Sequence, residues 1–281
     1  MIPLRDYSRS RSFPAVTVAL IITNLLVFLY QGYLATQGTV LNDGLSWQER
    51  NLSPPAFDPT SYRLVRGGRG TLYPVAREDY FVAQYGLVPY EVTKEIDLPP
   101  TIAFPIWLTL FTSMFLHGGL LHILGNMLYL WVFGDNVEDA MGHGRFLAFY
   151  VLCGAAASFT QVAIDPGSPI PQIGASGAIA GVLAAYFLLY PFARILTVVP
   201  ILFFIRVMAV PAVILLGLWF LLQVGSGVGS LGEAGGGVAW FAHIGGFLAG
   251  GLLVPLFKRR GVPVVLWQAI RGRRQGPTGP A

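Results

Sequence analysis

Two side chains with complementary chemistry stand out in an otherwise apolar sequence. Ser176 lies in the run Gly174-Ala175-Ser176-Gly177 at the start of one apolar segment, and His243 lies near the start of another. A serine hydroxyl is a weak nucleophile until a base takes its proton, and a neutral imidazole is suited to that role. The two residues therefore predict Ser176 as a nucleophile and His243 as its general base, then general acid.

A second pair of polar residues, His122 and Asn126, is spaced to share one face of a helix. Both side chains donate hydrogen bonds, and donors aimed at a developing oxyanion are worth roughly 10²–10³ in turnover each. The backbone N–H of Ser176, at a helix N-terminus, would add a third donor. His117, just before this helix, is expected to make a structural hydrogen bond that holds the outer loop.

Each of these residues also has a purely structural interpretation. The small residues 174–181 form a face suited to tight packing of membrane helices. A second small-residue face follows His243 and consists of Gly245, Gly246, Gly250 and Gly251. His243 could instead bind a backbone carbonyl, and His122 with Asn126 could clamp two helices together. Packing and catalysis are compatible, because small residues let the serine approach the helix of the histidine closely.

The composition is that of a membrane protein. Of the 281 residues, 54% are hydrophobic and only 11% are charged, against about 25% charged in soluble domains. The net charge of +4 does not indicate nucleic-acid binding, because basic residues gather before the first apolar run and after the last. This distribution predicts that both termini are cytoplasmic and that the number of spans is even. The single cysteine, Cys153, excludes an internal disulfide and a cysteine-rich metal site.

Apolar runs close to the ~20 residues needed to cross a bilayer predict six transmembrane helices. The first, 13–34, is too long for the core of a signal peptide and is interpreted as an uncleaved span. The other five form a core over 118–257, with helices at 118–137, 145–164, 176–192, 211–224 and 238–257.

The remaining segments flank these helices. Residues 1–12 form a cytoplasmic N-terminal segment, 35–117 an outer loop, and 258–281 a basic cytoplasmic tail that is expected to be disordered beyond Arg271. Two short apolar stretches, 102–116 and 195–205, are expected to lie in the membrane interface or to dip into the bilayer.

This topology gives a geometric prediction. The second, fourth and sixth helices all begin on the outer side, so His122, Asn126, Ser176 and His243 should meet in one layer of the outer half of the membrane. The nearest carboxylate to the histidine is Glu233, in a glycine-rich outer loop, so a dyad is predicted and not a triad.

This sequence lacks the residues that two other classes of intramembrane protease require. An aspartyl protease needs two facing aspartates, and Asp135 at the inner end of the second helix has no such partner. A zinc protease needs the His-Glu-x-x-His motif, which is absent. No metal or cofactor is therefore expected.

At these residues the chain resembles the rhomboid family of intramembrane serine proteases, over residues 111–253. The resemblance rests on His117-x4-His122-x3-Asn126, Gly174-x-Ser176-Gly177 and Ala242-His243-x-Gly245-Gly246, in that order. It implies an all-α polytopic bundle of six transmembrane helices, a Ser-His dyad, and an oxyanion site to which His122 and Asn126 contribute. The inner-side cluster of Gly134, Glu138, Gly142 and Arg145 is similar to a structural motif of the family.

One departure from the family bears on the site. Some members carry a tyrosine one turn after the nucleophile that stacks on the catalytic histidine, whereas this chain has Ala180. Another group must therefore hold the ring of His243, and the sequence leaves its identity open.

The predicted function is an intramembrane serine endopeptidase in the inner membrane of a bacterium. Its expected partners are the lipid bilayer and transmembrane protein substrates, without nucleic acid; no oligomeric state is indicated. Two alternatives stay open. One is a proteolytically inactive rhomboid-like binder or chaperone, whose relatives typically lose the serine or the histidine. The other is a small transporter, for which inverted repeats would be expected.

Overall fold

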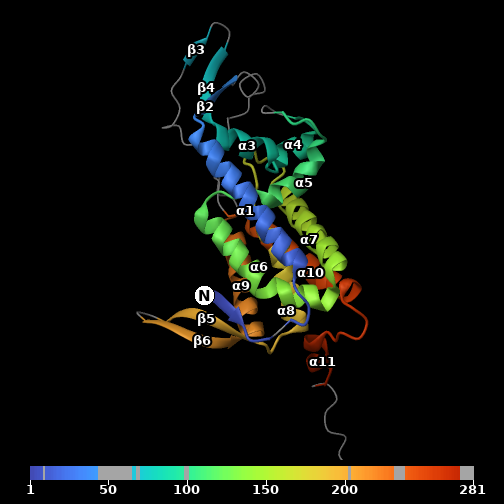
Figure 1. Ribbon diagram of the computed structural model, residues 1–281. Coiled ribbons are helices and arrows are strands. Elements are labelled where there is room, and N and C mark those ends of the chain that lie inside the picture. The colour runs from blue at the N-terminus through green and yellow to red at the C-terminus, as the bar shows by residue number, and fades with distance from the viewer. Residues whose placement is uncertain are drawn as a thin grey trace, which may run out of the picture.

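Long helices make up most of the protein, and two small antiparallel sheets lie at opposite ends of the helical bundle (Figure 1). The computed structural model describes residues 1–8, 10–43, 65–67, 70–97, 101–201, 204–230 and 238–272. Glu233 and residues 273–281, to which the sequence assigned an outer loop and a disordered tail, lie outside this range.

Each of the six predicted spans is a helix. They are α1 (Ala15–Thr36), α6 (Leu120–Met141), α7 (His143–Ile164), α8 (Ser176–Leu189), α9 (Ala212–Gly229) and α10 (Trp240–Phe257). Apolar helices suit a bilayer because all their backbone polar groups pair within the helix. Three C-terminal ends differ from the prediction by three residues or more, since α6 continues past 137, α9 continues past 224 and α8 stops before 192. Pro191 accounts for the earlier stop, because the residue before a proline disfavours helical backbone angles.

The predicted number of crossings, six, is not confirmed. Among the described residues, α1, α7, α9 and α10 are long and apolar enough to span a membrane. The helices over Ile106–Phe115 and Leu120–Met141 satisfy this test only as a pair, with a bend of 83° between them. At 1.5 Å per residue the 14-residue α8 is about 21 Å long, shorter than a hydrocarbon core of about 30 Å. The protein is therefore a polytopic helical bundle with four or five candidate spans and one short apolar helix.

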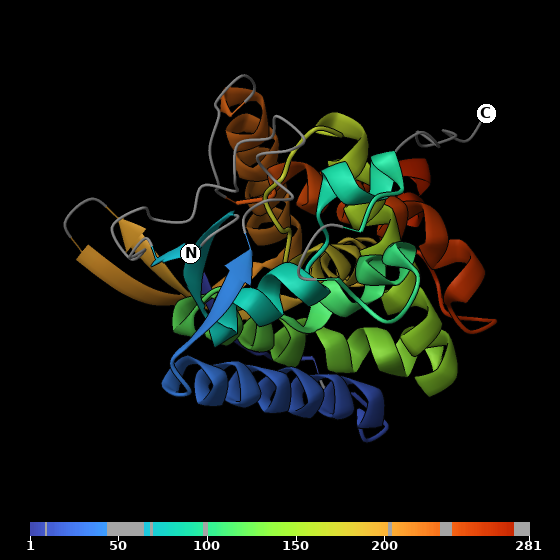
Figure 2. The ribbon, with the colours of Figure 1, turned by 90° about the horizontal axis from the view of Figure 1, so that it is seen from above.

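The short helix α8 occupies the centre of the bundle, as the view from above shows (Figure 2). It packs against α6, α7, α9 and α10, and every residue from 177 to 186 is buried. A helix that is apolar on all sides is stable only when it is surrounded in this way. Its glycines and alanines let the neighbouring helices approach closely. The bundle thus surrounds α8, the helix that begins at Ser176, with four other helices.

The predicted outer loop, 35–117, contains regular structure. Its strands are β2 (Thr39–Asp43), β3 (Val65–Gly67) and β4 (Gly70–Ala76), in the sheet order β2-β4-β3. Its helices are α3 (Arg77–Tyr85), α4 (Pro89–Lys94), η2 (Ile106–Leu108), α5 (Thr109–Thr112) and η3 (Ser113–Phe115). The last three lie within the apolar stretch 102–116 and lead into the bend before α6.

This segment fixes the loop that precedes α8. The backbones of Leu87 and Gln172 exchange hydrogen bonds of 3.0 and 2.8 Å, and the N–H of Tyr90 donates to the carbonyl of Ser168 at 3.0 Å. The N–H of Gly174 donates to the carbonyl of Ser113 at 2.8 Å. The chain just before Ser176 is therefore held by three separate backbone contacts.

The stretch 195–205, which is expected to lie in the interface or to dip into the bilayer, forms part of a β-hairpin. Strands β5 (Arg194–Ile201) and β6 (Phe204–Pro211) pair antiparallel, and β1 (Ile2–Asp6) adds to the other edge of β5. Ile195, Thr197 and Val199 are buried on one face, which is the two-residue period of a strand. β-Branched residues at these positions favour a strand over a helix.

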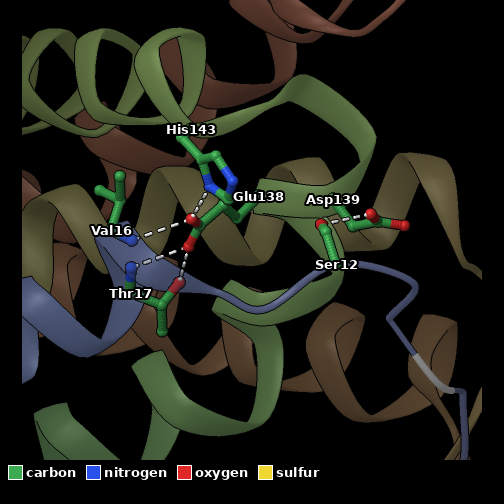
Figure 3. A network of polar contacts seen from close by, with 6 residues as sticks. All are labelled: Ser12, Val16, Thr17, Glu138, Asp139 and His143. Atoms are coloured by element: carbon green, nitrogen blue, oxygen red, sulfur yellow. Dashed lines mark hydrogen bonds and ion pairs between the residues drawn. The ribbon is translucent and has the colours of Figure 1, made fainter.

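The C-terminal end of α6 caps α1 (Figure 3). Glu138 is fully buried and accepts hydrogen bonds from the N–H groups of Val16 and Thr17, at 2.9 and 2.8 Å, and from the Thr17 hydroxyl at 2.7 Å. Nδ1 of His143 lies 2.5 Å from the same carboxylate. The first N–H groups of a helix have no partner within it, and negative charge is favourable there. The inner-side cluster therefore contributes a structural contact, as the sequence predicted.

Both basic ends of the chain lie at this end of the bundle. The amide of Asn136 in α6 donates to Asp6 of β1 at 2.8 Å. The N–H of Arg259, just after α10, donates to the carbonyl of Ala140 at 2.8 Å. The predicted tail then forms a short helix, α11 (Val265–Gly272).

Candidate active site

Ser176 is the first residue of α8, and its position is set by the loop before it. Gly174 has φ +121°, a backbone conformation that favours glycine, and its N–H is tied to the carbonyl of Ser113. The N-cap residue, Ala175, offers no side-chain cap, so the first N–H groups of α8 have no acceptor within the helix. The loop thus places a serine hydroxyl beside the first backbone N–H groups of α8.

The structure places Ser176 and His243 in direct contact. Oγ of Ser176 lies 2.7 Å from Nε2 of His243, and both side chains are only partly buried. His243 is in the first turn of α10, so the contact joins the beginnings of α8 and α10. A hydroxyl and an imidazole at this distance can exchange a proton directly.

Small residues bring α8 and α10 close enough for this contact. A Cβ added to Gly246 would collide with the carbonyl oxygen of Gly177, and one added to Gly250 would lie 2.5 Å from the Cα of Gly181. The two backbones therefore touch at two successive turns. On the other side of α8, a Cβ on Gly177 would lie 2.5 Å from the Cβ of Ala157 in α7. Both small-residue faces in the sequence serve packing, and this packing forms the Ser-His contact.

His122 and Asn126 lie beside the loop that carries the serine. A Cβ on Gly174 would lie 2.7 Å from Nε2 of His122 and 3.7 Å from Nδ2 of Asn126. Asn126 is 9% exposed, and its Nδ2 has no hydrogen-bond partner among the described residues. An amide that clamped two helices would be paired, so this donor is free to bind a group that enters the site.

His117 helps to hold the chain before α6, but through its backbone. Its N–H donates to Oε1 of Gln31 at 3.1 Å, and its carbonyl accepts from Nε2 of the same glutamine at 3.1 Å. The imidazole is fully buried, and its ring centre lies 5.0 Å from that of His122, edge to face. The expected anchoring of the outer segment is therefore made by α1 and the main chain of His117.

Gly245, in α10, packs tightly against Thr160 of α7.

Two residues contact the ring of His243, and neither was assigned that role from the sequence. Nδ1 of His243 lies 2.7 Å from Oε1 of Gln223 in α9, and the ring of Trp219 in the same helix lies 6.1 Å from the imidazole, tilted by 35°. Ala180, where some rhomboid proteins have a stacking tyrosine, carries no ring. The signal that could have identified Gln223 is a glutamine within an apolar span, because a polar group in a membrane helix needs a partner, and Gln223 is buried.

Comparisons with known proteins agree on one family. The family described as Rhomboid domain matches residues 105–260, more than half of the chain. "Rhomboid protease GluP" of Bacillus subtilis is 43% identical over 79 residues, which cover 28% of this chain and 15% of that protein.

Longer but weaker matches involve mitochondrial proteins. "Presenilin-associated rhomboid-like protein A, mitochondrial" of Danio rerio is 29% identical over 181 residues, covering 60% of this chain and 43% of that protein. The human "Presenilin-associated rhomboid-like protein, mitochondrial" is 30% identical over 172 residues, which cover 57% of this chain and 41% of that protein. The chain spans less than half the length of each of these relatives. Because the domain match covers more than half of its residues, the chain belongs to the rhomboid family.

Proposed function

We propose that this protein is an intramembrane serine endopeptidase that cleaves transmembrane segments of other membrane proteins. The observation that supports this most directly is the 2.7 Å contact between Oγ of Ser176 and Nε2 of His243. Family membership supports the same reaction class, since one of the relatives is named as a rhomboid protease.

The reaction follows from these two groups. As Oγ of Ser176 attacks the substrate carbonyl carbon, Nε2 of His243 takes the hydroxyl proton, and the carbonyl oxygen becomes an oxyanion. The C–N bond then breaks, and the imidazolium gives its proton to the leaving amine. A water molecule, deprotonated by the same imidazole, hydrolyses the acyl-enzyme and restores the serine. No metal or cofactor takes part in these steps.

The oxyanion is assigned to the donors around Gly174. Nδ2 of Asn126, which has no partner among the described residues, and the ring of His122 lie beside Gly174, and the N–H of Ser176 follows two residues later in the chain. Such donors stabilise charge that develops only as the tetrahedral intermediate forms. His117, Gly177, Gly245 and Gly246 have supporting roles in this proposal, through the contacts described above.

The substrate class follows from the surroundings of the site. The serine begins a helix that is enclosed by other apolar helices, and we expect a transmembrane substrate to enter laterally from the bilayer. A helical substrate hides its carbonyls in its own hydrogen bonds and must unwind locally before attack. Transmembrane segments with small or helix-breaking residues are therefore the expected substrates.

The test is covalent labelling of the purified protein in detergent with a fluorophosphonate probe. We expect modification at Ser176 in the wild-type protein, and none in Ser176→Ala or His243→Ala that retain the wild-type thermal stability. A single-span reporter protein should be cleaved only by the wild-type protein. Absence of labelling in the folded wild-type protein would leave the inactive binder as the better description, and equal labelling of all three would exclude Ser176 as the nucleophile.

For the orientation, we propose that both termini face the cytoplasm of a bacterium. Support comes from the basic residues of both ends, which lie at the same end of the bundle. In a Cys153→Ser background, Lys94→Cys should react with a membrane-impermeant maleimide in intact cells. Tyr7→Cys and Arg260→Cys should react only after permeabilisation, and their labelling in intact cells would reverse the orientation.

A further inference from the structure

The imidazole of His243 is held by a second hydrogen bond, on the side away from Ser176. Its Nδ1 lies 2.7 Å from Oε1 of Gln223, and its Nε2 lies 2.7 Å from the serine hydroxyl. The three side chains come from α9, α10 and α8 and form a continuous chain of hydrogen bonds. Gln223 is 7% exposed, so water does not compete strongly for this contact.

The contact determines which nitrogen of the ring carries the proton. A carbonyl oxygen such as Oε1 only accepts hydrogen bonds, so Nδ1 must be the protonated nitrogen of the neutral ring. Nε2 then presents its lone pair to the hydroxyl of Ser176. With the opposite tautomer, Nε2 would carry a hydrogen and could not act as a base toward the serine.

The same face of α9 also holds the plane of the ring. Trp219 and Gln223 are spaced by four residues and therefore lie on one face of the helix. The ring of Trp219 lies 6.1 Å from the imidazole, tilted by 35°, and it also packs against Phe247 one turn below His243. Because Ala180 of α8 has no ring, α9 supplies the contacts that orient the base.

We infer that Gln223 is a positioning residue for the reaction proposed above, on which this inference rests: it fixes His243 in the tautomer that accepts the serine proton. The amide does not touch the substrate and takes no proton itself. Burying a polar amide in an apolar helix is unfavourable, and the hydrogen bond to His243 offsets this penalty for Gln223.

The first test compares two substitutions of similar length. Gln223→Met removes the acceptor, and we expect the rate of fluorophosphonate acylation to fall by about 10–100-fold with probe affinity unchanged, because general-base catalysis contributes about 10²–10⁴. Gln223→Glu retains an acceptor oxygen and should recover most of this loss. Leu222→Met, at the exposed neighbouring position, is the matched control and should stay within about two-fold of wild type. Wild-type rates in a folded Gln223→Met protein would overturn the inference.

The second test does not depend on activity. In protein labelled with ¹⁵N-histidine, the signals of His243 are identified by their loss in His243→Ala. We expect Nδ1 protonated and Nε2 unprotonated in the wild-type protein, and a mixture of tautomers in Gln223→Met. Nε2 protonated in the wild-type protein, or unchanged signals in Gln223→Met, would refute the role of Gln223. If the probe labels no protein but the tautomer changes as expected, the proposed function fails and the positioning contact stands.

Discussion

Gly246→Val is expected to lower the rate of probe acylation at Ser176 by at least about 100-fold and to reduce thermal stability. A Cβ at this position would overlap the carbonyl of Gly177, the residue that follows the serine. The two helices must then separate by roughly an ångström, and displacements of about 1 Å can cost about 10²-fold in rate. Overpacking of this kind typically costs about 1–3 kcal/mol. Acylation kinetics and thermal unfolding of the detergent-solubilised protein measure the two effects.

The control is another glycine of the same helix. A Cβ on Gly251 would make only an ordinary contact, 3.9 Å from Cδ1 of Leu188. Gly251→Ala should therefore keep the acylation rate within about two-fold of wild type. Its thermal stability should equal or slightly exceed that of the wild-type protein, since alanine is more favourable than glycine in a helix by up to about 1 kcal/mol. If Gly246→Val acylates as fast as Gly251→Ala, close contact of α8 and α10 is not what brings the serine and histidine together.

Asn126→Ala is expected to lower the acylation rate by about 10²–10³-fold while the folded protein keeps its stability. The Nδ2 group has no partner among the described residues, so its removal breaks no hydrogen bond of the resting protein. Its expected contribution arises only when an oxyanion forms beside it. The measurement is the acylation rate at saturating probe, together with the thermal unfolding midpoint.

The neighbouring glycine offers a comparison for this substitution. A Cβ on Gly125 would meet no atom within 4 Å, so Gly125→Ala should change neither rate nor stability by much. A large loss of stability in Asn126→Ala would favour the structural interpretation, in which this amide clamps helices. An unchanged rate in a stable Asn126→Ala protein would remove the residue from the oxyanion site.

The sequence alone was sufficient to predict the membrane class, the six main helices and the residues to examine. Long apolar runs and scarce charge are local properties, and a bilayer permits few structures besides helices for them. The order of the three motifs indicated the family, which the domain match confirms. The catalytic roles of Ser176 and His243 remain predictions, although the structure brings their side chains together.

Other features depend on contacts between distant parts of the chain. The stretch 195–205 is apolar enough for a membrane-associated segment, but pairing with β6 and β1 makes it a strand. Likewise, hydropathy located α8 but did not indicate that a helix of 14 residues would be the centre of the bundle. Pairing partners and burial on all sides are set by the whole fold, so local sequence does not determine them.

The surroundings of the base were also decided by tertiary structure. Gln223 lies 20 residues from His243 and on another helix, and no periodicity in the sequence relates them. What joins them is the rotation of α9 against α10, which depends on how aromatic side chains and glycine backbones fit together between the helices. The sequence thus determined which chemical groups are present and at what helical spacing. Packing in three dimensions decided which of them touch, because a hydrogen bond requires atoms within about 3 Å, far finer than any hydropathy pattern can specify.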